Sequence, residues 1–210
     1  MKTFIKCLTL LLFLSSCEKD NERTPVLAGV YDDTFIFYEF SPNLPLDLKP
    51  DTLNKFYYGS DSLDVNLDGK YDLLMSRRIL LGTVPPARIT NDNYPFGRVT
   101  LNNGLEVSTK KEIYPIGLGQ TNEVNWVDTL LYNSRIDNLP EWSGSDTYRF
   151  MWVVPPASFW GSNGCWYNLI NAERYIGIRM KTNGRYNYGW IKLKQVSREE
   201  VYIVSYAMEK

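Results

Sequence analysis

Short runs of alternating hydrophobic and polar residues, separated by Gly, Pro, Asn and Asp, make up most of the chain. The segment 34–40, Thr-Phe-Ile-Phe-Tyr-Glu-Phe, is rich in β-branched and aromatic residues and is followed at once by Ser-Pro-Asn. Such runs predict β-strands, and no segment keeps apolar residues at helical spacing over three turns. Because Pro42, Pro45 and Pro50 lack the N–H group that a strand ladder needs, we expect an irregular segment after residue 41. Further strands are expected at residues 56–58, 62–66, 71–80, 98–102, 105–109, 124–132, 147–154, 174–182, 185–195 and 200–208.

Asn-Gly pairs mark two turns between these strands. In the first, a two-residue loop would place Leu101 opposite Glu106, whereas the three-residue loop 102–104 pairs Leu101 with Leu105 and Val99 with Val107. We prefer the three-residue loop, because it gathers the apolar side chains on one face and leaves a glycine free to adopt a positive φ.

The second turn, Asn183-Gly184, fits a two-residue loop and pairs Ile176 with Ile191. One face of the resulting hairpin is then aliphatic. We expect the other face to pack against the core or a second sheet, since strands of a sandwich are commonly covered. This second face is aromatic and basic and carries Arg179, Lys181, Tyr186, Tyr188 and Trp190.

The length of 210 residues suits one all-β domain, and no internal repeat of a propeller or solenoid is present. The sequence therefore predicts a single antiparallel β-sandwich, jelly-roll-like, over residues 26–210.

Charge and composition exclude several functions. The chain has 23 basic and 24 acidic residues, which argues against binding of nucleic acid, and it has no histidine. Histidine-dependent catalysis and histidine zinc sites are thereby excluded. Of the three cysteines, Cys7 and Cys17 belong to the N-terminal region, so we expect no disulfide within the chain and interpret Cys165 as a buried or half-buried apolar residue.

The first 16 residues have the pattern of a secretory leader: two lysines precede the apolar run 8–14, which is too short to span a bilayer. The run ends in Leu-Ser-Ser-Cys17, which resembles the bacterial lipobox, in which the cysteine becomes the acylated first residue of the mature protein. We therefore expect a signal peptide at 1–16, a lipidated flexible tether at 17–25, and attachment to the membrane through Cys17. The polar residues after Cys17 look like the tether of lipoproteins displayed on the outer membrane of Gram-negative cells.

The segment 64–72, Asp-Val-Asn-Leu-Asp-Gly-Lys-Tyr-Asp, places oxygen-bearing side chains at positions 1, 3, 5 and 9 of a loop, with glycine at position 6. Calcium prefers six to eight oxygen ligands, and an alternating loop can turn them inward together. The alternative is an Asp/Asn/Gly turn that binds no ion. Position 12 is Met75, so the glutamate of an EF-hand is missing, and the segment resembles the hairpin calcium loops of integrin-alpha-type propellers. The predicted structural calcium ligands are Asp64, Asn66, Asp68, Asp72 and the Lys70 carbonyl.

Three C-terminal segments, 175–179 (Tyr-Ile-Gly-Ile-Arg), 188–193 (Tyr-Gly-Trp-Ile-Lys-Leu) and 201–209, resemble the closing strands of a group of secreted bacterial β-sandwich proteins. Many members of that group also carry an upstream Asp-x-Asn-x-Asp-Gly-x-x-Asp segment. The resemblance covers about residues 56–210 and implies a β-sandwich in the cell envelope or outside the cell, with no particular activity.

All six tryptophans lie in the second half of the chain, and the segment 155–167 contains two of them. Trp160, Trp166 and Tyr167 could stack on sugar rings from an exposed loop, or could be buried as a cluster beneath it. Glu123, Asp128, Glu141 and Asp146 are available for a carboxylate-based hydrolase, but their spacing singles out no pair.

The expected function is that of a non-catalytic, calcium-binding surface lipoprotein of the outer membrane, acting in structure, adhesion or interaction with an envelope protein. The alternative is glycan binding through the loop aromatic residues.

Overall fold

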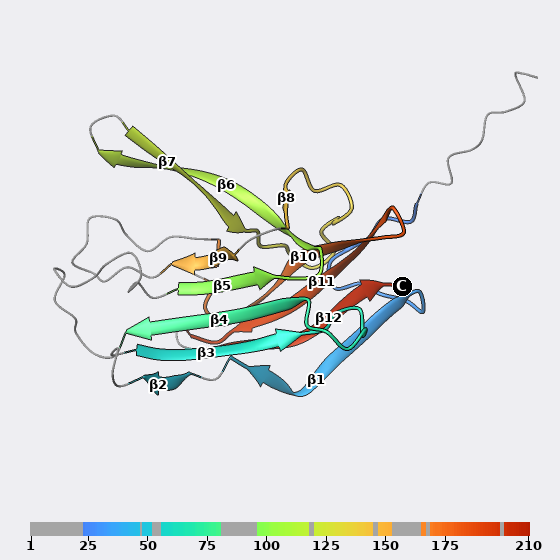
Figure 1. Cartoon of the computed structure of the whole chain (residues 1–210), viewed down its shortest axis with the longest axis horizontal. Helices are drawn as coiled ribbons and strands as arrows, with labels where there is room; N and C mark the ends of the chain where they lie inside the picture. The colour runs from blue at the N-terminus through green and yellow to red at the C-terminus, as the bar shows by residue number, and fades with distance from the viewer. Residues whose placement is uncertain are drawn as a thin grey trace, which may run out of the picture.

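The computed structural model describes residues 23–46, 48–51, 56–80, 96–117, 120–144, 147–152, 165–166, 169–197 and 200–210. In this part of the chain it contains twelve strands and no helix (Figure 1), so the prediction of an all-β fold is confirmed. Accordingly, no described segment forms a helix able to cross a membrane. The leader 1–16, the anchor Cys17, and the aromatic residues Trp160 and Tyr167 lie outside the described residues.

The strands form one curled sheet in the order β1-β12-β11-β10-β6-β7-β9-β5-β4-β3-β2, and β8 pairs with β6 outside this path. The ladders are antiparallel except for a parallel contact of β7 with β9 at Trp126 and Arg149. The strands are β1 (Phe35–Pro45), β2 (Lys49–Asp51), β3 (Phe56–Leu63), β4 (Leu73–Leu80), β5 (Phe96–Leu101), β6 (Leu105–Gly117), β7 (Gln120–Val127), β8 (Trp142–Ser143), β9 (Thr147–Trp152), β10 (Ala172–Thr182), β11 (Arg185–Gln195) and β12 (Val201–Glu209).

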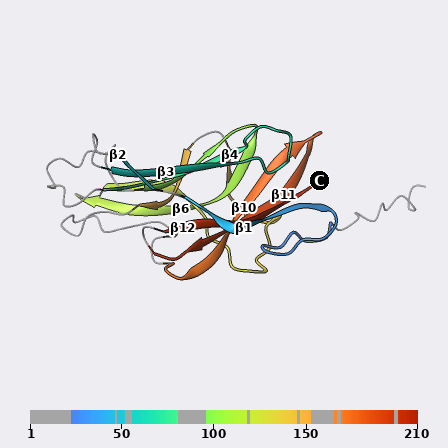
Figure 2. The ribbon, with the colours of Figure 1, turned by 90° about the horizontal axis from the view of Figure 1, so that it is seen from below.

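Strand β6 joins the two halves of this sheet. Its first residues, Leu105 to Val107, pair with β10, whereas the stretch from Thr109 onward pairs with β7. In Figure 2, β3 and β4 lie apart from β12 on the other side of the molecule. One continuous sheet, antiparallel apart from the β7–β9 contact, therefore curls so that its two halves face each other.

One apolar core fills the space between these halves. Leu73 and Met75 of β4 belong to the same buried cluster as Ile176 of β10, Ile191 of β11 and Ile203 of β12. All five are 0% exposed. The alternating apolar residues of each strand therefore lie on the side that faces the core. Burial of this apolar surface is the main contribution to the stability of the domain.

The outer face of β10–β12 is covered by a second cluster. Residues before β1 and residues of the segment between β7 and β8 pack there on Trp190, which is 2% exposed and donates a hydrogen bond from Nε1 to the Val30 carbonyl (3.1 Å). The buried members of this cluster are Val26, Ala28, Leu130, Ile136, Tyr175, Trp190 and Ala207. The expectation that Trp190 would be packed is therefore confirmed.

The turn at Asn183-Gly184 has the predicted register. Thr182 pairs with Arg185 and Ile176 with Ile191, and the turn residues have φ values of 53° and 82°. Positive φ at both central residues is the conformation that matches the twist of the flanking strands, which explains the Asn-Gly sequence.

The turn here has two central residues, Asn103 and Gly104, with φ values of 52° and 76°, and Leu105 N donates to the Asn102 carbonyl (3.0 Å). The preferred three-residue loop 102–104 is therefore wrong, and so is the predicted pairing across it. Val99 pairs with Met75 and Tyr148, whereas Val107 pairs with Ile178 and Ser143. The chain crosses here from one half of the sheet to the other. The apolar residues on the two sides of the turn therefore meet across the core instead of within one sheet.

Some predicted strand ends are also wrong. Strand β1 continues through a cis Ser41–Pro42 peptide to Pro45, with a register shift between Glu39 and Leu44, and β2 includes Pro50. Both strands lie at edges of the sheet, where a missing N–H is tolerated. In addition, β6 extends to Gly117 and forms with β7 a long hairpin.

Candidate metal centre

The segment 64–72 closes the β3–β4 hairpin, because Leu63 and Leu73 are the last paired residues on either side of it. Leu67 and Gly69 have positive φ values of 60° and 86°. A Cβ atom at position 69 would meet no atom within 4 Å, so glycine is required there by the backbone conformation and not by lack of space. The expected strands 62–66 and 71–80 are shortened accordingly.

Three oxygen-bearing side chains fold back over the loop backbone. Asp64 accepts hydrogen bonds from the backbone N–H groups of Asp68 (3.1 Å) and Gly69 (2.8 Å). Asn66 Oδ1 accepts from Asp68 N (2.9 Å), and Asp68 Oδ1 accepts from Lys70 N (2.9 Å). These bonds hold the first three predicted ligands in fixed orientations on the loop.

Asp72, the ligand expected at position 9, is fully buried at 0% exposure. Its Oδ2 accepts from Val65 N (2.9 Å), and its Oδ1 accepts from Asn103 Nδ2 (3.2 Å). Burial raises the pKa of this carboxyl group, its hydrogen bonds lower the pKa, and the nearby charge of Asp64 raises the pKa further. A buried, partly compensated carboxylate next to a second carboxylate is an environment that a cation would stabilise.

Asn103 is a functional residue that the sequence reasoning missed. Besides the bond to Asp72, its Nδ2 donates to the Tyr71 carbonyl (3.0 Å), so the 102–104 turn fastens the end of the loop. Its role depends on a contact between residues 31 positions apart, which the local turn pattern does not contain.

Two further contacts fix the loop on the opposite half of the sheet. Tyr206 of β12 donates a hydrogen bond to the Asp64 carbonyl (3.0 Å), and Asn66 Nδ2 lies 3.5 Å from Met180 Sδ of β10. Burial and then the Asp64 charge raise the pKa of Tyr206 to about 12, so the phenol remains a donor at neutral pH.

The groups of this loop are of the chemical kind that binds calcium, but their side chains are not close enough together to hold an ion. Side-chain oxygens and the carbonyl of the exposed Lys70 are the ligands that Ca²⁺ prefers. However, among the described residues no three His, Cys, Asp or Glu side chains are grouped closely enough to hold a metal ion. Coordination by Asp64, Asp68 and Asp72 together would therefore require their side chains to move closer to one another.

Trp166 does not form part of an open platform, which corrects its assignment as a ligand-binding residue. It is 1% exposed and packs in the main core, with its ring edge-to-face on Phe150 at a centroid distance of 6.2 Å. Trp166 is therefore buried, which is the alternative given in the sequence analysis to stacking on sugar rings.

Cys165 is half-buried, packs against the same core and is not disulfide-bonded. Burial, with a smaller effect of nearby carboxylates, raises its pKa to about 11. The thiol is therefore protonated at neutral pH, in agreement with its interpretation as an apolar packing residue.

Two of the four carboxylates considered for hydrolysis lie on one cavity. Asp128 and Glu141 line a volume of about 200 Å³ together with Lys110 and Lys111, and burial raises the pKa of Asp128. Glu123 instead forms an exposed ion pair with Lys111 (2.9 Å), and Asp146 lies outside the described residues.

Comparisons of the chain with protein-family models, with curated proteins and with solved structures find no match.

Proposed function

We propose that this protein is a calcium-binding, lipid-anchored module of the bacterial cell surface that acts without catalysis, in adhesion, assembly or envelope structure. The observation that carries the proposal is the set of oxygens at Asp64, Asn66 and Asp68, which fold back over one loop beside the buried Asp72.

The role assigned to calcium is structural. Asp72 contacts the beginning of the loop through Val65 and the neighbouring turn through Asn103. An ion held by Asp64, Asn66, Asp68, the Lys70 carbonyl and Asp72 would neutralise three carboxylates and would fix the loop between β3, β4 and the 102–104 turn.

The lipid anchor in this proposal rests on the leader, the Leu-Ser-Ser-Cys17 motif and the polar tether after it. Several acyl chains on one residue give stable membrane attachment, where a single chain would not. The location that follows is the outer membrane, with the domain facing outward.

Calcium binding can be tested by isothermal titration and thermal unfolding of residues 18–210 in calcium, magnesium and EDTA. At a calcium concentration 100 times the Kd, binding adds about 2.7 kcal/mol to the free energy of unfolding, which for this size raises Tm by roughly 5–10 °C. Asp64→Ala and Asp68→Ala should abolish both the heat and the shift. The matched control is Asp33→Ala, an exposed aspartate outside the loop.

Absence of heat and of any thermal shift in the wild-type chain would exclude the calcium site. Equal loss of binding in Asp33→Ala would show that the effect is not specific to the loop. The anchor is tested separately by the mass of the mature protein, in which Cys17 should carry acyl groups that Cys17→Ser lacks.

A further inference from the structure

One end of the domain brings together segments that are far apart in the sequence. The loop 64–72 contacts Met180 of β10 through Asn66. Met180 pairs with Asn187 of β11, close to the 183–184 turn that joins these two strands. Arg23, the first described residue, contacts the neighbouring Tyr186. In Figure 1 the β3–β4 loop, the tip of the β10–β11 hairpin and the C-terminal end of β12 lie on the same side. We call this region the tether end: Arg23, residues 30–34, the loop 64–72, the turn 183–184 and Lys210.

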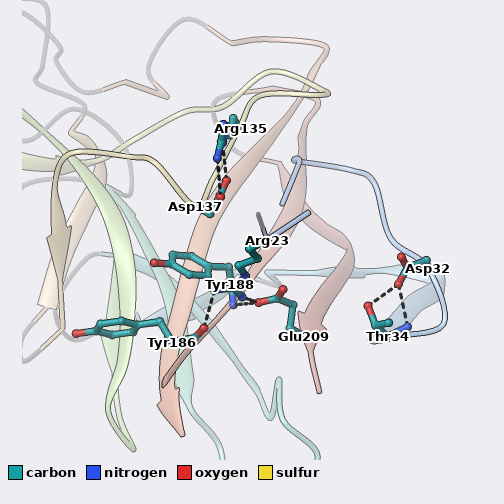
Figure 3. A network of polar contacts seen from close by, with 8 residues as sticks. All are labelled: Arg23, Asp32, Thr34, Arg135, Asp137, Tyr186, Tyr188 and Glu209. Atoms are coloured by element: carbon teal, nitrogen blue, oxygen red, sulfur yellow. Dashed lines mark hydrogen bonds and ion pairs between the residues drawn. The ribbon is translucent and has the colours of Figure 1, made fainter. Parts of the chain in front are cut away.

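Arg23 fastens the chain to this end by three contacts, shown in Figure 3. Its guanidinium donates to the Tyr186 carbonyl (3.0 Å), forms an ion pair with Glu209 and lies 4.6 Å above the centre of the Tyr188 ring. Glu209 is itself held by a hydrogen bond from Tyr188 N (2.7 Å). Charge-assisted bonds and a cation–π contact together fix the position of Arg23 on the domain.

We call the contacts of Arg23 with Tyr186, Tyr188 and Glu209 the Arg23 clamp. Only residues 18–22 lie between Cys17 and this clamp. A fully extended chain spans at most about 3.6 Å per residue, so Arg23 lies within about 22 Å of Cys17. With Cys17 acylated, the tether end is therefore the part of the domain held next to the bilayer.

The exposed side chains of the tether end suit that position. Leu67 is 61% exposed, Tyr71 55% and Tyr31 47%. A half-open cavity of about 490 Å³ lies at the same end, with Arg185 and Lys210 on its wall beside Val30 and Tyr31. Tyrosine rings favour the headgroup region of a bilayer, and basic side chains are attracted to anionic lipids. Carboxylates are also present here, at Asp32, at the exposed Asp33 and in the loop, and bound calcium would neutralise those of the loop.

We propose that the tether end is a membrane-docking surface, in which the Arg23 clamp holds Leu67 and Tyr71 against the headgroups while Arg185 and Lys210 contact lipid phosphates. This inference rests on the proposed lipid anchor, and its partner is a bilayer containing anionic phospholipid. The opposite end of the domain then faces away from the membrane. Ile113 of β6 marks that end: it is 59% exposed and lies eight residues along the strand from Leu105, the partner of Met180.

The test uses the acylated protein in vesicles of phosphatidylcholine and phosphatidylglycerol, with about 1 mM calcium, a level that suits extracellular calcium modules. A fluorophore is attached to Leu67→Cys or, as the matched control, to Ile113→Cys, and a headgroup nitroxide lipid quenches it. Cys165 is half-buried and burial raises its pKa to about 11, so it should react more slowly than these exposed sites, and labelling of the protein without either new cysteine gives the background. We expect quenching at position 67 to exceed that at position 113 by about threefold or more, since only the former lies at headgroup depth. Equal quenching, or stronger quenching at 113, would overturn the proposal.

The clamp is tested by Arg23→Ala in the Leu67→Cys background, which should reduce quenching to the level of Ile113→Cys. The control is Arg135→Ala, which removes an exposed arginine whose partner is Asp137 (2.9 Å) and should leave quenching unchanged. Unchanged quenching in Arg23→Ala would exclude the clamp.

Failure of the anchor is recognised independently, because the mass of the same preparation reports the acylation of Cys17. If acylation is absent, the same labels are followed while vesicles are added to residues 18–210, which lack the thiol of Cys17. A blue shift of emission at position 67 but not at 113 then supports the docking surface, and no shift at either position overturns it.

Discussion

Gly189 of β11 lies opposite Met208 of β12 in their ladder. A Cβ atom at this position would overlap the Ala207 carbonyl oxygen and would lie 2.9 Å from Met208 Cα. Both obstacles are backbone atoms of the neighbouring strand, so a change of rotamer cannot relieve them. Gly189→Ala therefore forces β12 away from β11, and overpacking of this kind costs typically 1–3 kcal/mol and occasionally more.

We expect Gly189→Ala to lower the free energy of unfolding by about 3 kcal/mol, at the upper end of that range, because the obstruction is backbone. For a domain of this size the corresponding decrease in Tm is roughly 6–12 °C, measurable by tryptophan fluorescence during thermal unfolding.

The matched control is Gly177→Ala on the adjacent strand. A Cβ atom there meets only side chains, Ser108 Oγ at 3.0 Å and two leucine methyl groups at 3.3 Å. These groups can move, so the change should cost less than about 1 kcal/mol after the gain from a less flexible unfolded chain. Unfolding of Gly189→Ala within about 2 °C of the wild type, or equal damage by both changes, would refute the reasoning.

Four further predictions concern separate parts of the domain. Gly184→Ala should cost about 1–2 kcal/mol in urea unfolding, for conformational reasons alone, because φ is 82° and a Cβ would meet no atom within 4 Å. Trp166→Ala should cost about 3–5 kcal/mol by the same measurement, and a change below about 0.5 kcal/mol would mean that the ring is on the surface. Cys165 should react with Ellman's reagent only slowly at pH 8 in the folded protein and rapidly in guanidinium, since burial raises its pKa to about 11; equal rates would contradict this. Burial raises the pKa of Asp128 above its ordinary value of 3.8, so the folded state holds this proton more tightly than the unfolded state does. The folded state is therefore favoured while Asp128 is protonated, and it loses that stability as the pH rises through the raised pKa. The Tm of Asp128→Asn should therefore rise relative to the wild type between pH 3 and pH 7, and parallel pH profiles would refute the assignment.

The sequence predicts the 183–184 hairpin in full because all the information is local. A two-residue turn with positive φ at both positions fixes the register, so the pairs of β10 and β11 follow from counting outward. The 102–104 turn shows the limit of the same reasoning. Apolar alternation around it indicates which faces are buried, but it does not distinguish pairing within a sheet from packing across a core.

The same limit applies to the candidate metal centre. Spacing alone identifies the loop 64–72 and its oxygen-bearing residues, because the alternation lies within nine positions. The contacts of Asn103 and Tyr206 with this loop join residues 31 and 142 positions apart, and the fold alone brings them together. The burial of Trp166, a turn residue, likewise depends on Phe150 of β9.

Because β1 pairs with β12, the first strand of the domain cannot pair until the last strand is present. Phe35 lies opposite Glu209, and the ladder continues to Pro45 and Tyr202. During synthesis, the sheet cannot be completed until the nine-residue strand β12 has emerged, because β12 also separates β1 from β11. Contacts between such distant segments carry a large loop-closure entropy, so the closing of this sheet edge is expected to be a slow step of folding.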